Sequence, residues 1–239
     1  MGGFGYHPEV VARFPAIRAG VIHCTGVNNG PTPQSLLDAY RHEQEAARGR
    51  IGDTPLSEIP SLAAWRRAFS SFGVKPTQYR NAAESLLRRL TKKGDIPSMN
   101  TLVDLANLVS IRHQMPVAVF DQAEVVGTTT VRFATGHERF TDLGSDTLSH
   151  PDTGEVIFAD EDSVVSARRW CWRQSAKSAA GPGTVDALIT VEGQHEGAED
   201  EVALATGDLL ALLDTHQSGA TFSHAPLSPE SPWFEFGSA

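Results

Sequence analysis

The chain has 239 residues, of which 40% are hydrophobic and 21% are charged, and its formal charge at pH 7 is −9. This composition excludes a disordered chain, and the length suffices for one large domain with its own core. No apolar stretch approaches the roughly 20 residues of a membrane-spanning helix, and the N-terminal residues lack the pattern of a secretory signal. We therefore expect a cytoplasmic protein without a membrane partner.

The first hundred residues favour helices. The predicted elements are a strand over 18–27 and helices over 33–48, 61–72 and 77–93. Thr32 and Pro33 supply an N-cap and a first-turn proline for the first of these helices. Gly73 and Gly94 follow the other two, at the position where a left-handed residue commonly ends a helix.

The second part of the chain is rich in short β-branched runs that are separated by Gly, Asp and Pro turns. The predicted elements are strands over 117–120, 128–134, 155–159, 163–173 and 185–192, and an amphipathic helix over 199–215. Helices that come first and strands that come later indicate an α+β (mixed α/β) fold with a largely antiparallel sheet. We expect a single domain over residues 1–217 with two intertwined halves, about 1–95 and 96–217, and a loosely held tail over 218–239.

A further helix is expected between Ser98, which would cap it, and Pro116. Apolar residues cover most of its faces, so the helix is predicted to be buried. Asn100, Asp104 and Asn107 lie at i, i+4 and i+7 and would share one stripe. Buried polar groups cost about 1–3 kcal/mol each without hydrogen bonds. The stripe therefore either ties down neighbouring main chain or lines a pocket for a small molecule or a nucleotide.

Three arginines and two tryptophans lie close together within residues 168–174. In a strand, Trp170 and Trp172 would share one face, and Arg169, Cys171 and Arg173 would lie on the other. Arginines beside tryptophans can stack on bases or bind a phosphate. Two tryptophans on one face are also typical of a packed core, whereas Arg173 and Gln174 are expected to face solvent.

No cofactor and no metal site is predicted. Cys24 and Cys171 are far apart and belong to no CxxC motif, so both are expected to be reduced, buried thiols. The nine histidines form no HxH or HxxxH pair. The GxSxG, GxGxxG and phosphate-loop motifs are absent.

Charge is unevenly distributed along the chain. Residues 61–112 carry nine Lys/Arg and three Asp/Glu, whereas residues 184–239 carry ten Asp/Glu and no Lys/Arg. An acidic chain is not expected to bind DNA or to cover a long nucleic acid, but the basic segment could contact a few phosphates. The alternative is that its cations, such as Arg88, Arg89, Lys92 and Lys93, form only the solvated face and last turn of a helix.

An Asn-x-x-x-Asp-x-x-Asn helix within 96–109 is followed by characteristic segments at 115–121, 131–144 and 154–160. This ordered set resembles the B3/B4 module of the bacterial phenylalanyl-tRNA synthetase β subunit, over roughly residues 87–176, and residues 14–86 look like its free-standing relatives. The resemblance implies a B3/B4-like fold and trans-acting hydrolysis of the ester bond of mischarged aminoacyl-tRNA, with the tRNA acceptor end as partner. Because an aminoacyl ester is labile, a positioned water and a supported oxyanion can suffice.

The resemblance also implies roles for individual residues. The catalytic candidates are Asn100, Asp104, Asn107, Glu155 and Gln174, and the substrate-binding candidates are Arg132, Arg169, Trp170, Trp172 and Arg173. Ala118 and Ala106 stand where the synthetase pattern has a histidine and a threonine, and residues 169–174 replace its glycine-rich segment. Both departures fall on the editing pocket, so the tyrosine specificity of the synthetase module is not expected here.

Three functions stay open at this point. The first is an aminoacyl-tRNA deacylase with an altered choice of amino acid. The second is a non-catalytic module that binds tRNA or an amino acid, and the third is a small-molecule hydrolase that reuses the pocket. The oligomeric state is not predicted.

Overall fold

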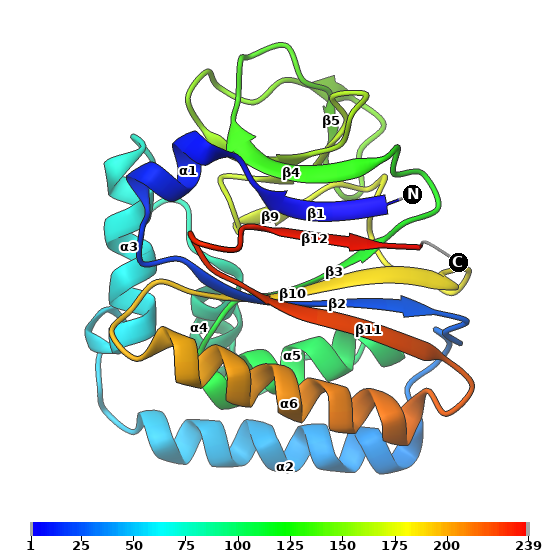
Figure 1. Ribbon diagram of the computed structural model, residues 1–239. Coiled ribbons are helices and arrows are strands. Elements are labelled where there is room, and N and C mark those ends of the chain that lie inside the picture. Colours follow the sequence, from blue (N-terminus) through cyan, green and yellow to red (C-terminus); the bar gives the residue numbers. More distant parts are fainter. Residues whose placement is uncertain (1, 238–239) are drawn as a thin grey trace.

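The computed structural model describes residues 2–237 (Figure 1). Within this range the chain forms the helices α1 (Pro8–Arg13), α2 (Gln34–Ile51), α3 (Pro60–Ser71), α4 (Ala82–Lys93), α5 (Thr101–His113) and α6 (Ala198–His216), and the short 3-10 helix η1 (Leu56–Glu58). None of these helices combines the length and the apolar composition that a bilayer-spanning helix requires.

Two sheets and a small hairpin hold the strands. In spatial order the six-stranded sheet is β12 (Trp233–Phe236), β1 (Gly2–Tyr6), β4 (Thr128–Phe133), β7 (Val156–Ala159), β8 (Val165–Arg168) and β9 (Arg173–Gln174). The four-stranded sheet is β11 (Thr221–Leu227), β2 (Arg18–Thr25), β10 (Asp186–Gly193) and β3 (Val117–Asp121), and the hairpin is β5 (Phe140–Thr141) with β6 (Leu148–Ser149). Only β1 and β4 pair in parallel among the described strands. The predicted α+β class with a largely antiparallel sheet is confirmed.

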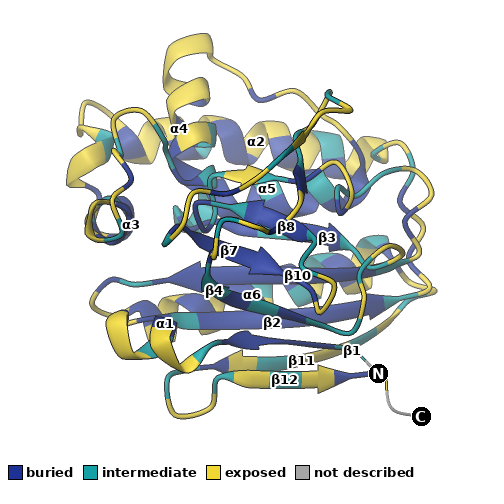
Figure 2. Ribbon diagram, turned by 90° about the horizontal axis from the view of Figure 1, so that it is seen from above, coloured by how far each residue is buried: buried dark blue, intermediate teal, exposed yellow. Residues whose placement is uncertain are grey.

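The four-stranded sheet is the middle layer of the molecule. Figure 1 shows α2, α5 and α6 on one side of it and the six-stranded sheet on the other. In β2, Ile22 and Cys24 pack against the helices, whereas Ala19 and Val21 pack toward the other sheet. Because both faces of the sheet are covered, β2 and β10 are almost wholly buried (Figure 2), which explains their nearly continuous apolar sequences.

Several predicted element boundaries are wrong for local reasons. Helix α4 begins at Ala82 instead of Thr77, because Asn81 caps it by accepting a hydrogen bond from the Glu84 amide at 2.9 Å. Helix α5 is capped by Asn100 and not by Ser98. Gly73 and Gly94 do take positive φ values, 87° and 88°, at the ends of α3 and α4 as predicted.

The strand predicted over 163–173 is interrupted in its middle. Arg169 and Trp170 have φ values of 45° and 61°, which reverse the chain between β8 and β9. Trp170 and Trp172 therefore do not share one strand face as predicted. Trp170 is completely buried, and Trp172 is half-buried.

The expected loose tail is also corrected where the structure describes it, over residues 218–237. Strand β11 pairs with β2 along seven residues, and β12 pairs with β1 along four. Each strand thus forms the edge of a sheet and satisfies backbone hydrogen bonds of its neighbour. Residues 238–239 lie outside the described part of the chain.

We expect a chain that ends at Gln217 to be strongly destabilised, because it leaves β1 and β2 as unpaired edges. Thermal unfolding followed by circular dichroism measures this, with a chain that ends at Gly237 as the control. Equal melting temperatures for the two chains would show that β11 and β12 add nothing to stability.

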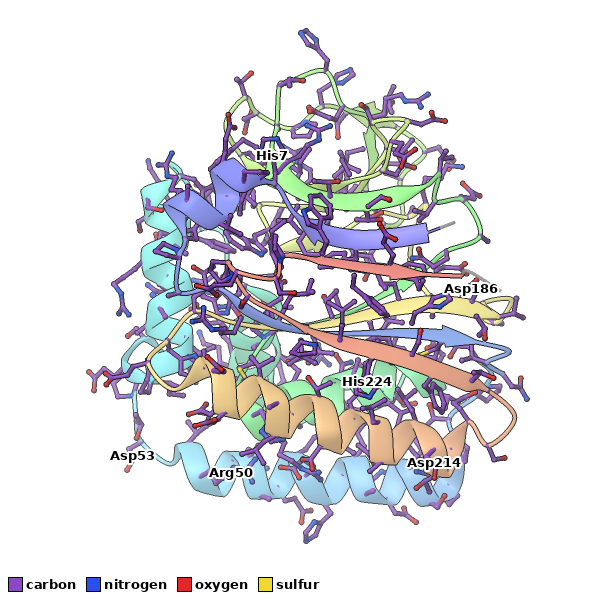
Figure 3. The ribbon with its side chains drawn as sticks, in the orientation of Figure 1. His7, Arg50, Asp53, Asp186, Asp214 and His224 are labelled. Carbon is purple, nitrogen blue, oxygen red and sulfur yellow. The ribbon has the colours of Figure 1, made fainter. Side chains whose placement is uncertain are left out.

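A network of ion pairs joins helices α2, α5 and α6. Glu43 on α2 is 2.6 Å from Arg50 and 2.8 Å from Arg112 of α5, and Arg112 is 3.2 Å from Asp208 of α6. Figure 3 shows Arg50 on α2. Burial favours a raised pKa for Glu43, but the hydrogen bonds and charges of the two arginines outweigh it and lower the pKa below 4.5.

We expect Glu43→Gln to lower the free energy of unfolding by about 1–3 kcal/mol at neutral pH. Because the pKa of Glu43 is lowered in the fold, its contribution is fully present above pH 4.5 and is lost as the pH falls through the folded pKa. Urea unfolding at neutral and acidic pH measures this difference. Glu45→Gln, at an exposed position of the same helix, is the control and should leave stability unchanged.

Candidate functional site

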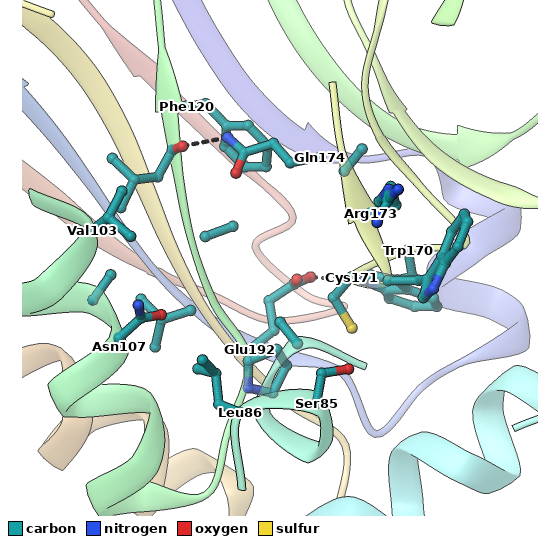
Figure 4. A pocket seen from close by; sticks show the side chains of 18 of the residues that line it. Ser85, Leu86, Val103, Asn107, Phe120, Trp170, Cys171, Arg173, Gln174 and Glu192 are labelled. Atoms are coloured by element: carbon teal, nitrogen blue, oxygen red, sulfur yellow. Dashed lines mark hydrogen bonds between the residues drawn. The ribbon is translucent and has the colours of Figure 1, made fainter. Parts of the chain in front are cut away.

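A cavity of about 410 Å³ lies between α4, α5, β3 and the segment that follows β8 (Figure 4). Its volume falls within the range of small-molecule sites, about 300–1,000 Å³. The polar groups of its lining are Ser85, Arg89, Asn107, Cys171, Arg173, Gln174 and Glu192. The remaining wall is apolar, with side chains from α4, α5 and β3 such as Leu86, Val103 and Val119.

Glu192 is the buried acid of this cavity. It lies on β10, where side chains alternate between the helical layer and the six-stranded sheet, and it points toward the sheet with only 2% of its surface exposed. Its Oε1 accepts a hydrogen bond from the Tyr6 hydroxyl at 2.6 Å and another from the Trp170 indole nitrogen at 2.8 Å. Among residues 2–237, no group donates a hydrogen bond to its Oε2.

Burial raises the pKa of Glu192 to about 7, against the lowering effect of the hydrogen bonds from Trp170 and Tyr6. Burial and the neighbouring Glu192 also raise the pKa of the Tyr6 hydroxyl well above 10. The pair therefore consists of an acid that titrates near neutral pH and a hydroxyl that keeps its proton. A ligand donor that reached Oε2 would favour the ionised carboxylate.

The turn at Arg169 and Trp170 brings the next residues to the cavity wall. The Cys171 carbonyl accepts a hydrogen bond from the Ala82 amide at 2.8 Å, which joins this wall to the first turn of α4. Burial and the nearby Glu192 raise the pKa of the Cys171 thiol well above 9. The half-buried thiol is therefore protonated at neutral pH and is a poor nucleophile.

Gln174 and two arginines supply the other fixed polar groups. The Gln174 amide nitrogen donates to the main-chain carbonyls of Val119 and Ser178 (3.0 Å), so its carbonyl oxygen is the group left for a ligand or water. Arg173 is half-exposed and is bound to Asp142 at 2.6 Å. Arg89 is exposed on α4, so both arginines place positive charge at the cavity.

The B3/4 domain family model matches residues 64–206, which include α4, α5, the 169–174 segment and Glu192. The chain belongs to the B3/4 domain family. The resemblance inferred from the ordered motifs is thereby confirmed. No curated protein matches the chain.

Among solved structures, the chain is similar to an N-terminal fragment of the phenylalanyl-tRNA synthetase beta subunit from Pyrococcus horikoshii. The TM-score is 0.48 at 10% sequence identity, and the match covers 92% of this chain and 50% of that one. The chain therefore spans about half the length of this structural relative.

Half of the predicted site residues meet at the cavity of this B3/4 domain. The lining includes Asn107, Trp170, Trp172, Arg173 and Gln174, and it excludes Asn100, Asp104, Arg132, Glu155 and Arg169. The two alanines at the departures, Ala106 and Ala118, also line the cavity. Their small side chains leave open the space that a threonine and a histidine would fill.

Of the two interpretations of the Asn100, Asp104 and Asn107 stripe, the one in which the side chains tie down neighbouring segments holds for Asn100 and Asp104, and only Asn107 lines the cavity. Asn100 accepts from the Val103 amide at 3.0 Å and donates to the Ala180 carbonyl at 3.1 Å. Asp104 accepts from the Thr32 and Ser98 hydroxyls and from the Met99 amide. Both groups therefore fix main chain, and the face of α5 toward the cavity is Val103, Ala106 and Asn107.

Glu155 and the arginines around it are paired with one another outside the cavity. Glu155 is 3% exposed and binds the Arg168 guanidinium at 2.8 Å and the Arg169 amide at 3.1 Å. The Arg169 guanidinium lies 4.0 Å from the centre of the Tyr79 ring and 4.7 Å from that of Trp172. These contacts stabilise the turn that follows β8.

Arg132 is held by Glu138, which also accepts hydrogen bonds from the Thr135 and Gly136 amides. Burial opposes the ionised form, but these hydrogen bonds lower the pKa of Glu138 to about 2. Arg132 thus belongs to a structural ion pair. No group of three or more His, Cys, Asp or Glu side chains within residues 2–237 is arranged to hold a metal ion.

Sequence reasoning missed Glu192. It follows an apolar run in a predicted strand, and an acid at the end of such a run, on the buried face of the strand, is the signal that could have identified it.

We expect Glu192→Gln to flatten the pH dependence of stability. The pKa of Glu192 is about 7 in the fold and 4.5 for the ordinary group, so the folded state holds the proton more tightly. The wild type should lose about 3 kcal/mol of unfolding free energy as the pH rises from 4.5 to 7, because the unfolded chain ionises first. Denaturant titrations at several pH values measure this loss.

Glu196→Gln, at an exposed position after β10, is the control for this experiment and should follow the wild-type curve. Parallel curves for the wild type and Glu192→Gln would contradict the raised pKa.

Proposed function

We propose that the cavity receives the aminoacyl group of an aminoacyl-tRNA and that the protein hydrolyses the ester bond to the terminal ribose. The observation that carries this proposal is a mostly apolar cavity of about 410 Å³ with one buried acid, Glu192, and the fixed amide group of Gln174 in its wall. Membership of the B3/4 domain family supports the same function.

Hydrolysis of this ester requires only a positioned water and a hydrogen-bond donor for the oxyanion. Water adds to the ester carbonyl, the tetrahedral oxyanion collapses, and the ribose oxygen leaves with a proton that comes from the water. The Gln174 carbonyl oxygen can hold the attacking water, since the amide nitrogen of this side chain is fixed on main chain. The Asn107 amide can donate to the oxyanion.

Glu192 fits the role of a binding group at the buried end of the substrate. Its free Oε2 can accept one hydrogen bond in a cavity whose wall is mostly apolar. A side chain that carries a hydrogen-bond donor at its end is therefore favoured over one that leaves this carboxylate unpaired.

A non-catalytic module that binds tRNA or an amino acid is the second candidate. The observation that favours it is the lack of an activated nucleophile in the cavity lining. The Cys171 thiol of the lining is protonated at neutral pH.

A panel of aminoacyl-tRNAs incubated with the protein tests the proposal. We expect deacylation above the spontaneous rate for one or a few amino acids. Ala118→Leu, which fills the cavity from β3, should abolish this activity while the melting temperature changes little. Gln174→Ala should reduce kcat by about tenfold or more, because it removes the group that orients water.

Asn100→Ser is the matched control, because a serine can still cap α5 and this position lies outside the cavity. It should leave the rate unchanged. Binding of tRNA without any deacylation would favour the non-catalytic module. Hydrolysis of simple aminoacyl esters without any effect of tRNA would favour a small-molecule hydrolase.

A further inference from the structure

A second hollow lies on the other side of α4 and is lined by cations. It has a volume of about 330 Å³ between η1, α3 and α4. Its lining consists of Leu56, Ser57, Arg66, Arg80, Glu84, Arg88, Thr91 and Lys92, and we call it the basic groove.

The basic groove keeps an excess of positive charge after its internal ion pairs are counted. Glu84 is its single acid, 4% exposed, and it lies 2.7 Å from Arg66 and 3.5 Å from Arg80. Arg88 and Lys92 are exposed and form no ion pair with any residue between 2 and 237. Two cations in a hollow are therefore free to bind an anion.

The stability of helix α4 does not explain why both position 88 and position 92 carry a cation. Arg88 and Lys92 are four residues apart, where like charges repel and destabilise a helix. Residues 60–94 carry eight Lys/Arg and one Glu, although the whole chain has a formal charge of −9. This concentration of cations on α3, on α4 and in the segment between them is more than the favourable interaction of Lys92 and Lys93 with the helix dipole requires.

Helix α4 also separates the basic groove from the cavity. Ser85, Leu86 and Arg89 line the cavity, while Arg88 and Lys92 line the groove. The two sites therefore lie on different faces of the same helix. Figure 2 shows that the outer part of α4 is exposed, so an extended strand can pass over it from one site to the other.

We propose that the basic groove binds backbone phosphates of the single-stranded 3′ end of a tRNA whose terminal aminoacyl group occupies the cavity. This inference rests on the proposed function, because the cavity defines where the strand ends. Arg88 presents a planar fork of donors to a phosphate, and Lys92 adds a point charge one helical turn away. Arg66 and Arg80 stay fixed on Glu84 and form the positive wall of the groove.

The test is the double variant Arg88→Glu/Lys92→Glu, with binding of uncharged tRNA measured by fluorescence anisotropy over a series of salt concentrations. We expect the Kd to rise by about tenfold or more, and the slope of log Kd against log salt to fall by about 1.4, since two single-strand phosphate contacts are lost. The variant Arg41→Glu/Arg139→Glu makes the same change of charge at exposed positions outside the groove. It should change the Kd by less than about threefold.

Equal weakening by both double variants would overturn the inference, because net charge and not the groove would then control binding. Polyglutamate and unlabelled RNA can each be tested as competitors of labelled tRNA at equal ionic strength. If polyglutamate displaces the tRNA as strongly as RNA does, the inference is also overturned, in favour of an acidic peptide partner. Wild-type protein that binds no tRNA would overturn it as well.

A third measurement separates this inference from the proposed function. If the groove variant deacylates aminoacyl-tRNA as fast as the wild type at low substrate concentration, the proposal that the basic groove binds tRNA is wrong, whereas the proposed hydrolysis is supported. If the wild type deacylates no aminoacyl-tRNA, and the groove variant but not the control variant weakens tRNA binding, the basic groove does bind tRNA and the proposed hydrolysis is wrong.

Discussion

The buried carboxylate of Glu192 is the constraint on which the arrangement of the cavity depends. A carboxylate between two sheets must be hydrogen-bonded, and its partners come from two distant parts of the chain, Tyr6 of β1 and Trp170 after β8. The backbone at Arg169 and Trp170 has positive φ at the turn where the buried Trp170 side chain meets Glu192. The same turn presents Cys171, whose carbonyl holds the first turn of α4. Glu192 thus helps to position two walls of the cavity, the segment after β8 and the first turn of α4.

Much of the fold follows from residue patterns that operate locally. Gly73 and Gly94 end helices, β-branched runs form strands, and the order of the elements indicates the α+β class. The start of α4 was predicted too early because Lys75 and Thr77 lie in turns that precede the true cap, Asn81. An Asn followed three residues later by Glu is a capping signal that the sequence contains.

The cavity was less predictable, because it depends on contacts between distant segments. Asn107 and Gln174 were identified, but the spacing that joined Asn100 to Asn107 suggested the wrong face of α5. Asn100 is the cap of that helix, and Asp104 is turned toward Thr32, far away in the sequence. Glu192 resembles any acid at the end of a strand until the partners from β1 and from the Trp170 turn are known. The pairing of β11 and β12 likewise depends on their long-range partners.

The pairing of β12 with β1 joins two segments that are separated by nearly the whole chain. The edge of the six-stranded sheet therefore cannot close until residue 236 has been synthesised. Loop closure over such a distance is slow compared with local helix formation, so β1 stays an open edge of the sheet until the distant strand reaches it. We infer that the six-stranded sheet closes late in folding, after the local helices have formed.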